Sequence, residues 1–220
     1  MTLIDTFFSD FSDDCTQTLA KQVLLGTTAY KKFFHTSKDF FSYPEYSSLR
    51  GYLLNYSVQK TLYDSAFVST SLYKAIPMKV NNYGCSVLHI RTDNFQLTTA
   101  KTPKWNSLPA KSKYKLRYAS ANTGCDGQYS FDFVNEQISS APYYAVLTYG
   151  YNMLTNDCTH IDLVVPDSSF TNILYRKDLL LKNNKELLIL PTEKEVDDAI
   201  VSLNAEFESI VRLKAQGRES

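Results

Sequence analysis

The sequence predicts an α+β protein with N-terminal helices, a mostly antiparallel central sheet and a long amphipathic helix at the C-terminus. Three observations support this fold class. Apolar residues recur at helical spacing from Cys15 to Phe34, short β-prone runs fill the middle of the chain, and a capped apolar stripe begins at Thr192. Chains whose helical and strand segments are grouped rather than alternating are typical of α+β folds.

Two helices are expected in the first third of the chain. Asp13 and Asp14 precede the first helical stretch, where acidic charges stabilise a helix N-terminus. Gly26 lies inside this stretch and is unfavourable in a helix interior. The second helix is expected to begin within residues 42–45, because Pro44 suits a first helical turn, and its apolar face continues towards Lys60.

The middle and later parts of the chain contain short runs rich in β-branched and aromatic residues, bounded by Gly, Pro, Asn and Asp. The first three runs predict an antiparallel meander, and two strongly β-prone runs after Pro142 predict a hairpin. The expected strands are Ala75–Val80, Cys85–Arg91, Phe95–Ala100, Tyr129–Val134, Tyr143–Tyr151, Thr159–Val165 and Glu186–Leu190.

The clearest helix signal follows Thr192. Glu195 lies three residues further on, which is the spacing of a capping box. We expect the apolar stripe that follows to pack on the sheet or, alternatively, to dock on a partner or a second copy of the chain. Residues 216–220 are expected to form a frayed tail. The stripe consists of Val196, Ile200, Leu203, Phe207, Ile210 and either Leu213 or Val211.

Composition indicates one globular domain that spans residues 1–220. Hydrophobic residues make up 44% of the chain, charged residues 21%, and Gly and Pro occur seven times each, which argues against disorder. No repeat, low-complexity segment or long linker divides the sequence. A chain of 220 residues buries enough surface to fold without a disulfide or a metal ion.

Cysteine spacing and the lack of long apolar runs exclude further classes of protein. The four cysteines, at positions 15, 85, 125 and 158, form no CxxC pair, which disfavours zinc ribbons and thioredoxin-type sites. The first residues show no signal-peptide pattern, and no apolar run approaches the roughly 18 residues of a membrane span. We therefore expect a cytoplasmic protein with reduced thiols, no cofactor, no metal and no membrane contact.

The main functional signal is a segment without acidic residues. No Asp or Glu occurs between Asp93 and Asp126, although the net charge of the whole chain is zero. Its cations would attract phosphates or an acidic protein surface, and its rings could stack on bases. The alternative is a solvated face that balances acidic faces elsewhere. The candidate binding residues are Lys101, Lys104, Trp105, Lys111, Lys113, Tyr114, Lys115 and Arg117.

The secondary structure of this segment affects the strength of the signal. Pro103 and Pro109 bracket a loop, and residues 110–120 are expected to form a short basic helix. The lysines at positions 111, 113 and 115 would share one side of a strand, but they spread around a helix.

A metal-dependent nuclease is a third possibility. Restriction-type nucleases have an acidic residue near the end of one strand of a hairpin. The next strand carries a second acidic residue, then any residue, then a lysine, and together these side chains hold magnesium and activate water. Asp93 and Lys101 fit parts of this pattern, but Thr99 stands where an acid is required. Glu45 and Asp162 are the other candidate carboxylates.

Other catalytic arrangements are sparse. His160 and Asp162 would share one face of a strand, and a neighbouring hairpin could add His89 to form a two-histidine, one-carboxylate set. Cys158 lies near His160 but has poor spacing for a nucleophile and its base. The sequence has no P-loop, no Rossmann fingerprint and no Gly-x-Ser-x-Gly elbow.

Three groups of short segments resemble those of a known group of proteins. They are Arg50–Asn55, then Asn94–Thr99 followed by Leu108, Pro109 and Arg117, and finally Leu147–Tyr151 with Val165–Asp167. Together they resemble an uncharacterised family of small proteins from Gram-positive bacteria and their phages. Such families tend to sit in mobile elements, so the resemblance implies a role in toxin–antitoxin or phage-conflict systems. It implies no catalytic residue.

The leading prediction is a nucleic-acid-binding protein that contacts DNA or RNA through residues 101–118. The alternative is a protein-interaction module, inhibitor-like or antitoxin-like, that binds an acidic or apolar partner surface or forms a homodimer. The third is a divergent metal-dependent nuclease. The module would use the final helix, through Ile200, Leu203, Phe207 and Ile210.

Overall fold

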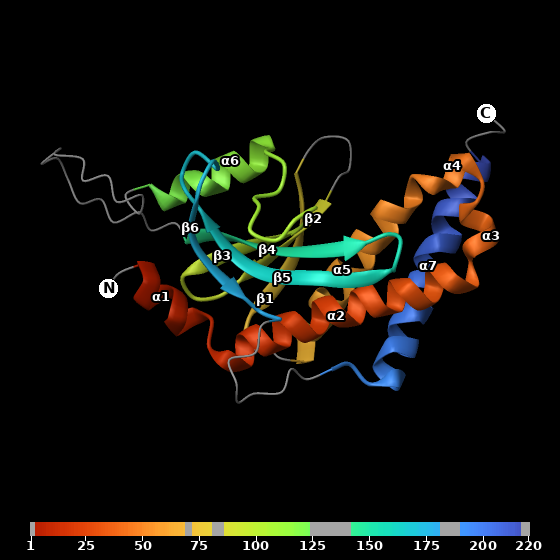
Figure 1. Cartoon of the computed structure of the whole chain (residues 1–220), viewed down its shortest axis with the longest axis horizontal. Helices are drawn as coiled ribbons and strands as arrows, with labels where there is room; N and C mark the ends of the chain where they lie inside the picture. The colour runs from red at the N-terminus through yellow and green to blue at the C-terminus, as the bar shows by residue number, and fades with distance from the viewer. Residues whose placement is uncertain (1–2, 69–71, 81–85, 124–141, 181–189, 217–220) are drawn as a thin grey trace, which may run out of the picture.

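The computed structural model describes residues 3–68, 72–80, 86–123, 142–180 and 190–216 (Figure 1). Within these ranges, long helices cover one face of a six-stranded sheet and a short helix covers part of the other, which confirms the α+β prediction. The helices are α1 (Leu3–Asp10), α2 (Asp13–Thr36), α3 (Lys38–Phe41), α4 (Pro44–Ser47), α5 (Leu49–Val68), α6 (Lys113–Ala119), the 3-10 turn η1 (Ser120–Asn122) and α7 (Glu193–Gln216). The strands are β1 (Lys74–Lys79), β2 (Ser86–Arg91), β3 (Phe95–Lys101), β4 (Tyr143–Asn152), β5 (Asp157–Pro166) and β6 (Ile173–Asp178).

The strands lie side by side in the order in which the chain makes them, from β1 to β6. Neighbouring strands are antiparallel except β3 and β4, which run parallel with Leu97 beside Ala145. A parallel pair needs a crossover connection, and here the connection includes α6 and η1. Both the predicted meander, β1 to β3, and the predicted hairpin, β4 with β5, are confirmed.

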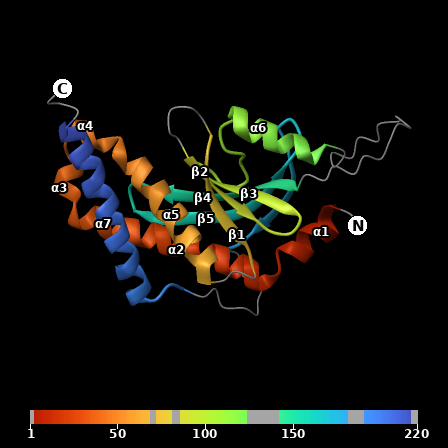
Figure 2. The same ribbon diagram turned by 180° about the vertical axis from the view of Figure 1, so that it is seen from behind.

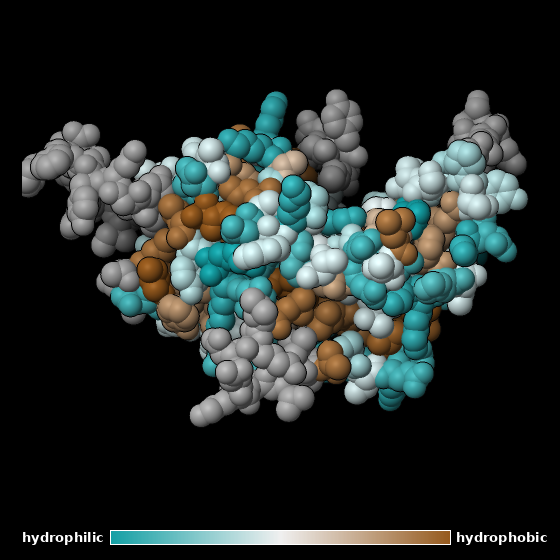
Figure 3. Space-filling view, viewed as in Figure 1, coloured by the Kyte–Doolittle hydropathy of each residue, from teal (hydrophilic) through white to brown (hydrophobic). Residues whose placement is uncertain are grey.

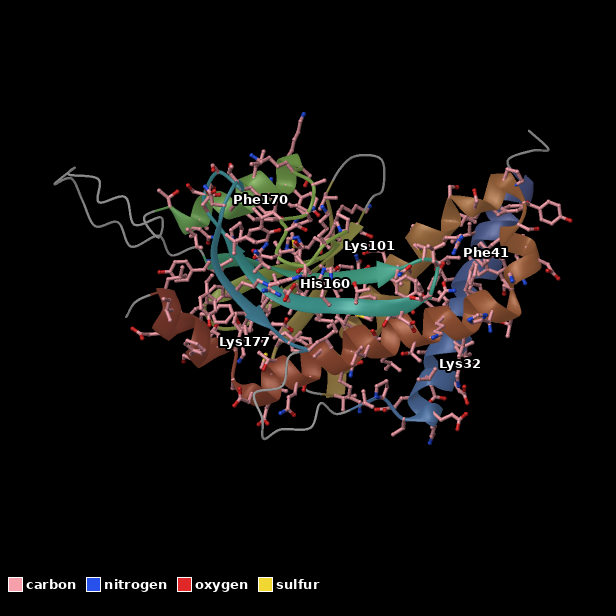
Figure 4. All side chains as sticks on the ribbon, viewed as in Figure 1. Lys32, Phe41, Lys101, His160, Phe170 and Lys177 are labelled. Atoms are coloured by element: carbon pink, nitrogen blue, oxygen red, sulfur yellow. The ribbon has the colours of Figure 1, made fainter. Side chains whose placement is uncertain are left out.

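The two faces of the sheet differ in chemistry because side chains alternate along each strand. Leu97, Leu147 and Leu163 face the long helices and belong to the main core. Figures 1 and 2 show α6 on the opposite side of the sheet from α2 and α5. Figure 4 shows the same contrast for two side chains, with Phe170 beside α6 and Lys177 towards α1 and α2.

Helices α2 and α5 pack closely at a glycine. The Ser57 hydroxyl of α5 donates a buried hydrogen bond of 2.8 Å to the carbonyl oxygen of Gly26 in α2. A side chain at Gly26 would meet the backbone of α5, so glycine is what allows this approach. The residue that weakened the helix prediction therefore has a packing role.

The final helix packs on other helices, so the expectation that it packs on the sheet is wrong. Leu203 is 1% exposed in the main core, and the Phe207 ring lies 5.3 Å from that of Phe33 and 4.6 Å from that of Phe40. Helix α2 already covers the sheet there, so α7 forms an outer layer over α2 and α5. The capping box is confirmed, because the Thr192 amide donates to Glu195 Oε2 at 2.7 Å and the Glu195 amide to Thr192 Oγ1 at 3.3 Å.

Several elements differ from the sequence-based expectations. Helix α1 was not predicted. Phe7 in this helix and Phe11 directly after it pack against Phe95 in the core. Strand β6 was also not predicted, since its side chains are all half-buried and show no alternation. The second predicted helix is divided into α4 and α5, and the short helix α3 before it was not predicted. The strand predicted over 129–134, most of the one over 186–190 and nearly all of the predicted tail lie outside the described residues.

Candidate nucleic-acid interface

The sheet face beneath α6 is unusually polar for a buried surface. Seven polar side chains on this face are no more than about a tenth exposed, and buried polar groups are more informative than buried apolar ones. They come from β2, β3, β4 and β5, at the positions that alternate with the main-core residues. They are His89, Gln96, Thr98, Tyr144, Thr148, His160 and Asp162.

A small second core holds α6 against this face. Ala119 packs with Tyr144, Val146 and Phe170. The Asn122 amide nitrogen donates to the carbonyl oxygens of Tyr144, at 2.9 Å, and Pro166, at 2.8 Å, and its side-chain oxygen accepts from the Tyr144 amide at 2.8 Å. These three buried hydrogen bonds fix the crossover to β4 and β5, so the side chains of α6 have defined positions.

The residues predicted as a binding site are only partly brought together. Residues 113–119 form a helix, as expected for the basic segment, and Lys104, Lys111, Lys113 and Arg117 are exposed on the α6 side. Figure 3 shows hydrophilic side chains protruding where α6 lies, at the top of the view. Trp105 is exposed and Tyr114 is half-buried.

Two of the predicted lysines have other positions. Lys115 is 7% exposed, burial lowers its pKa, and its Nζ donates to the Ala110 carbonyl at 2.9 Å. It turns inward because alternate residues of a helix face different directions. Lys101 shares the register position of Tyr149 and therefore points to the α5 side, where burial and the nearby Arg50 lower its pKa.

A hollow of about 240 Å³ lies where the end of α6 meets the sheet. Arg117 and Tyr118 line it, with the Arg117 guanidinium 5.2 Å from the centre of the Tyr118 ring and one nitrogen donating to the Tyr118 hydroxyl at 3.3 Å. Gln96 also lines the hollow, and its amide nitrogen donates to His89 Nδ1 at 2.8 Å. The hollow thus combines a guanidinium, an aromatic ring and a primary amide.

His89 behind this hollow is a neutral, structural group. It is buried, and burial together with Arg91 and Arg117 lowers its pKa. At neutral pH its Nδ1 therefore accepts the hydrogen bond from Gln96, which orients the amide. Sequence reasoning missed Gln96, and its alternation with the apolar Phe95 and Leu97 was the signal that it faces away from the main core.

A second polar cluster lies at the other end of the same face. Asp162 is 1% exposed and accepts a 2.6 Å ion-paired hydrogen bond from Arg176, which also contacts Asp178 at 3.3 Å. Burial raises the pKa of Asp162, and Arg176 opposes that rise. His160 Nε2 shares a 2.8 Å hydrogen bond with Thr102 Oγ1. Arg176 was missed because it lies in β6, a strand that the sequence pattern did not reveal.

This cluster does not supply the metal set considered from the sequence. His89 lies on β2 and His160 on β5, with two strands between them, so they are at least about 14 Å apart. Asp162 is occupied by Arg176. Among the described residues, no group of three or more His, Cys, Asp and Glu side chains could hold a metal ion.

The nuclease and thiol arrangements are not assembled either. Asp93 precedes β3 and Lys101 ends it, so the two are about 26 Å apart along the strand. Asp162 faces α6 whereas Lys101 faces α5, and the Glu45 side chain lies outside the described residues. Burial raises the pKa of Cys158 to about 11, so this thiol is protonated at neutral pH.

The four residues of the final helix considered for partner binding contribute to internal packing. Leu203, Phe207 and Ile210 pack in or against the main core, and Ile200 packs against Val196 and its neighbours in a small cluster with α2. Val201 and Leu213 are the exposed large apolar residues of this helix among those described.

Comparisons with protein-family models, with curated proteins and with solved structures find no match for this chain. The resemblance to a family from Gram-positive bacteria and their phages therefore stays a prediction. None of the helices in the described parts of the chain is long and apolar enough to span a membrane.

Proposed function

We propose that the protein binds DNA or RNA through the face of the sheet that carries α6. The observation that best supports this is a set of exposed cations on that face, Lys104, Lys111, Lys113 and Arg117. None of the four forms an ion pair with a carboxylate among the described residues, whereas lysines on α2 do. Unpaired cations gathered on one face favour binding to a phosphate backbone.

The hollow beside Arg117 provides a place for one nucleotide. Arginine presents a planar fork of donors that matches phosphate oxygens. The Tyr118 ring lines the same hollow and supports the Arg117 guanidinium, which lies 5.2 Å from the ring centre. The Gln96 amide adds a group that hydrogen-bonds to base edges or sugar hydroxyls. Charge alone would bind any acidic polymer, and the combination with a ring and an amide favours nucleic acid.

The cellular setting is part of the same proposal. The resemblance described above favours a mobile-element context, in a toxin–antitoxin or phage-conflict system. We place the protein in the cytoplasm as part of this proposal, because nucleic acid of a host cell or an infecting phage is present there.

Binding of fluorescent single- and double-stranded DNA and RNA tests the proposal, with anisotropy measured between about 50 and 200 mM salt. The affinity should fall linearly on a log–log plot, because each phosphate contact releases counterions. A Lys111→Ala, Lys113→Ala, Arg117→Ala variant should bind more weakly, and its slope should be lower by about 2 to 3.

A second triple variant controls for the loss of net charge. Lys38→Ala, Lys194→Ala, Arg212→Ala removes the same charge from exposed positions on α3 and α7 and should bind like the wild type. Equal weakening by both variants would reduce the proposal to a general charge effect. An absence of binding at low salt would refute it and redirect the search to an acidic protein partner, tested with polyglutamate as a probe.

A further inference from the structure

Trp105 is exposed to solvent and yet held in place. It is the single tryptophan of the chain, and it is 61% exposed. The Arg176 guanidinium carbon lies 4.1 Å from the centre of its ring system. A guanidinium stacked at this distance covers one face of the indole, so the solvent exposure belongs to the opposite face and the ring edge.

The guanidinium under Trp105 is itself fixed. Asp162 accepts from Arg176 at 2.6 Å and Asp178 at 3.3 Å, and Asp162 is almost fully buried. Two carboxylates hold the planar group in one orientation, and in the low-dielectric interior the ion pair with Asp162 is not easily broken. Arg176 therefore serves as a rigid support for the indole rather than as a free cation.

The turn that carries Trp105 is anchored on both sides. Before it, the Thr102 amide donates to the Tyr149 carbonyl at 2.9 Å, and the Thr102 hydroxyl bonds to His160. After it, Pro109 is buried and Lys115 donates to the Ala110 carbonyl. A flat ring on an anchored turn, backed by a fixed guanidinium, loses little conformational entropy when a ligand stacks on it.

We propose that the open face of Trp105 is a stacking platform for an unpaired base, so that the ligand is single-stranded nucleic acid. This inference rests on the function proposed above. A base in a duplex is already stacked on its neighbours, whereas a single-stranded base presents a free face. Lys104, next in sequence, and Lys111, on the same side of the sheet, are exposed cations that can contact the flanking phosphates.

The surroundings of Trp105 differ from those of other exposed aromatic residues, such as Phe67. Phe67, at the end of α5, is 66% exposed but has no cation beneath its ring among the described contacts and lies outside the acid-free segment. Trp105 combines exposure, a rigid support and neighbouring cations. Phe67 is therefore the matched control for Trp105.

The test uses the intrinsic fluorescence of Trp105, because no other tryptophan contributes to the signal. Oligo(dT) should quench it on binding, and an abasic oligonucleotide of equal length should bind through phosphates without quenching it. Trp105→Ala should weaken oligo(dT) binding by about 5- to 150-fold, Trp105→Phe by less, and Phe67→Ala not at all. Binding of the abasic strand should be the same for all four proteins.

The possible failures are distinguishable. If the wild type binds nucleic acid but oligo(dT) leaves the fluorescence unchanged, or Trp105→Ala binds oligo(dT) as tightly as the wild type, the platform is refuted and the proposed function stands. Quenching by polyglutamate equal to that by oligo(dT) would overturn the platform in favour of an acidic protein ligand. If no nucleic acid binds at low salt, both proposals fall.

Discussion

Two glycines in long helices should respond in opposite directions to the same substitution. A Cβ atom at Gly26 would lie 2.6 Å from the Cα of Val58 and 2.9 Å from the carbonyl oxygen of Ser57, both in the backbone of α5. A Cβ atom at Gly51 would have nothing within 4 Å. Alanine relieves the unfavourable entropy of glycine in either helix, so only the surroundings separate the two cases.

The magnitudes follow from three contributions. Replacing glycine with alanine in a helix stabilises the fold by about 0.5–1 kcal/mol, which is the whole expected effect for Gly51→Ala. Gly26→Ala adds an overpacking cost of about 1–3 kcal/mol, since α2 and α5 must move apart. It also disturbs the buried hydrogen bond from Ser57 to residue 26, worth about 1 kcal/mol. Gly26→Ala should therefore be destabilising by about 1–3 kcal/mol.

Urea unfolding followed by circular dichroism will measure both free energies. For a chain of this size, 1 kcal/mol corresponds to a shift of about 2–4 °C in Tm, so thermal scans should show Gly26→Ala below and Gly51→Ala above the wild type. A stabilised Gly26→Ala variant would refute the close packing of α2 and α5. A destabilised Gly51→Ala variant would show that the space around α5 is not open.

Three further predictions follow from other contacts. Thr192→Ala should cost about 1 kcal/mol in urea unfolding, because it removes the hydroxyl that accepts from the Glu195 amide. Arg176→Met should cost about 3–5 kcal/mol at neutral pH, since Asp162 stays buried without its partner. Burial raises the pKa of Asp162, so the folded state binds the carboxyl proton more tightly than the unfolded state does. The loss of stability in Arg176→Met should therefore shrink as the pH falls towards about 4. Burial raises the pKa of Cys158 to about 11, so mass spectrometry should show its alkylation at about pH 8 to be on the order of 100-fold slower in the folded protein than in urea.

The predictions for Arg176 and Cys158 can each be contradicted by a specific result. Arg212→Met removes an exposed ion pair with Glu208 and should change stability by less than about 1 kcal/mol at any pH. A pH-independent loss for Arg176→Met would contradict a charged, buried Asp162. Alkylation of Cys158 at equal rates in folded and unfolded protein would contradict its burial.

The strongest local signals in the sequence led to correct elements. The capping box at Thr192, the acidic start of α2 and the β-prone runs of β4 and β5 all depend on neighbours within a few residues. Such patterns are readable because helix caps and strand alternation are short-range properties of the backbone. The basic helix near Lys113 was expected for the same reason.

The elements that were missed depend on partners far away in the chain. Strand β6 exists because β5 pairs with it, and α1 is held by rings from β3 and β6. The final helix shows the same limit: its apolar stripe was readable, but the choice of α2 and α5 as its partner was not. An apolar stripe demands burial without specifying the surface that provides it.

In the candidate site, the sequence determined the composition and the tertiary structure determined the direction of the side chains. The sequence alone determined that residues 101–118 are rich in cations and rings and free of acids, because composition needs no coordinates. Only the tertiary structure decided that Lys115 turns inward, that Lys101 faces the other side of the sheet and that Arg176 supports Trp105. Side-chain direction is set by the helix or strand that carries it, and long-range contacts are set by the order of strands in the sheet.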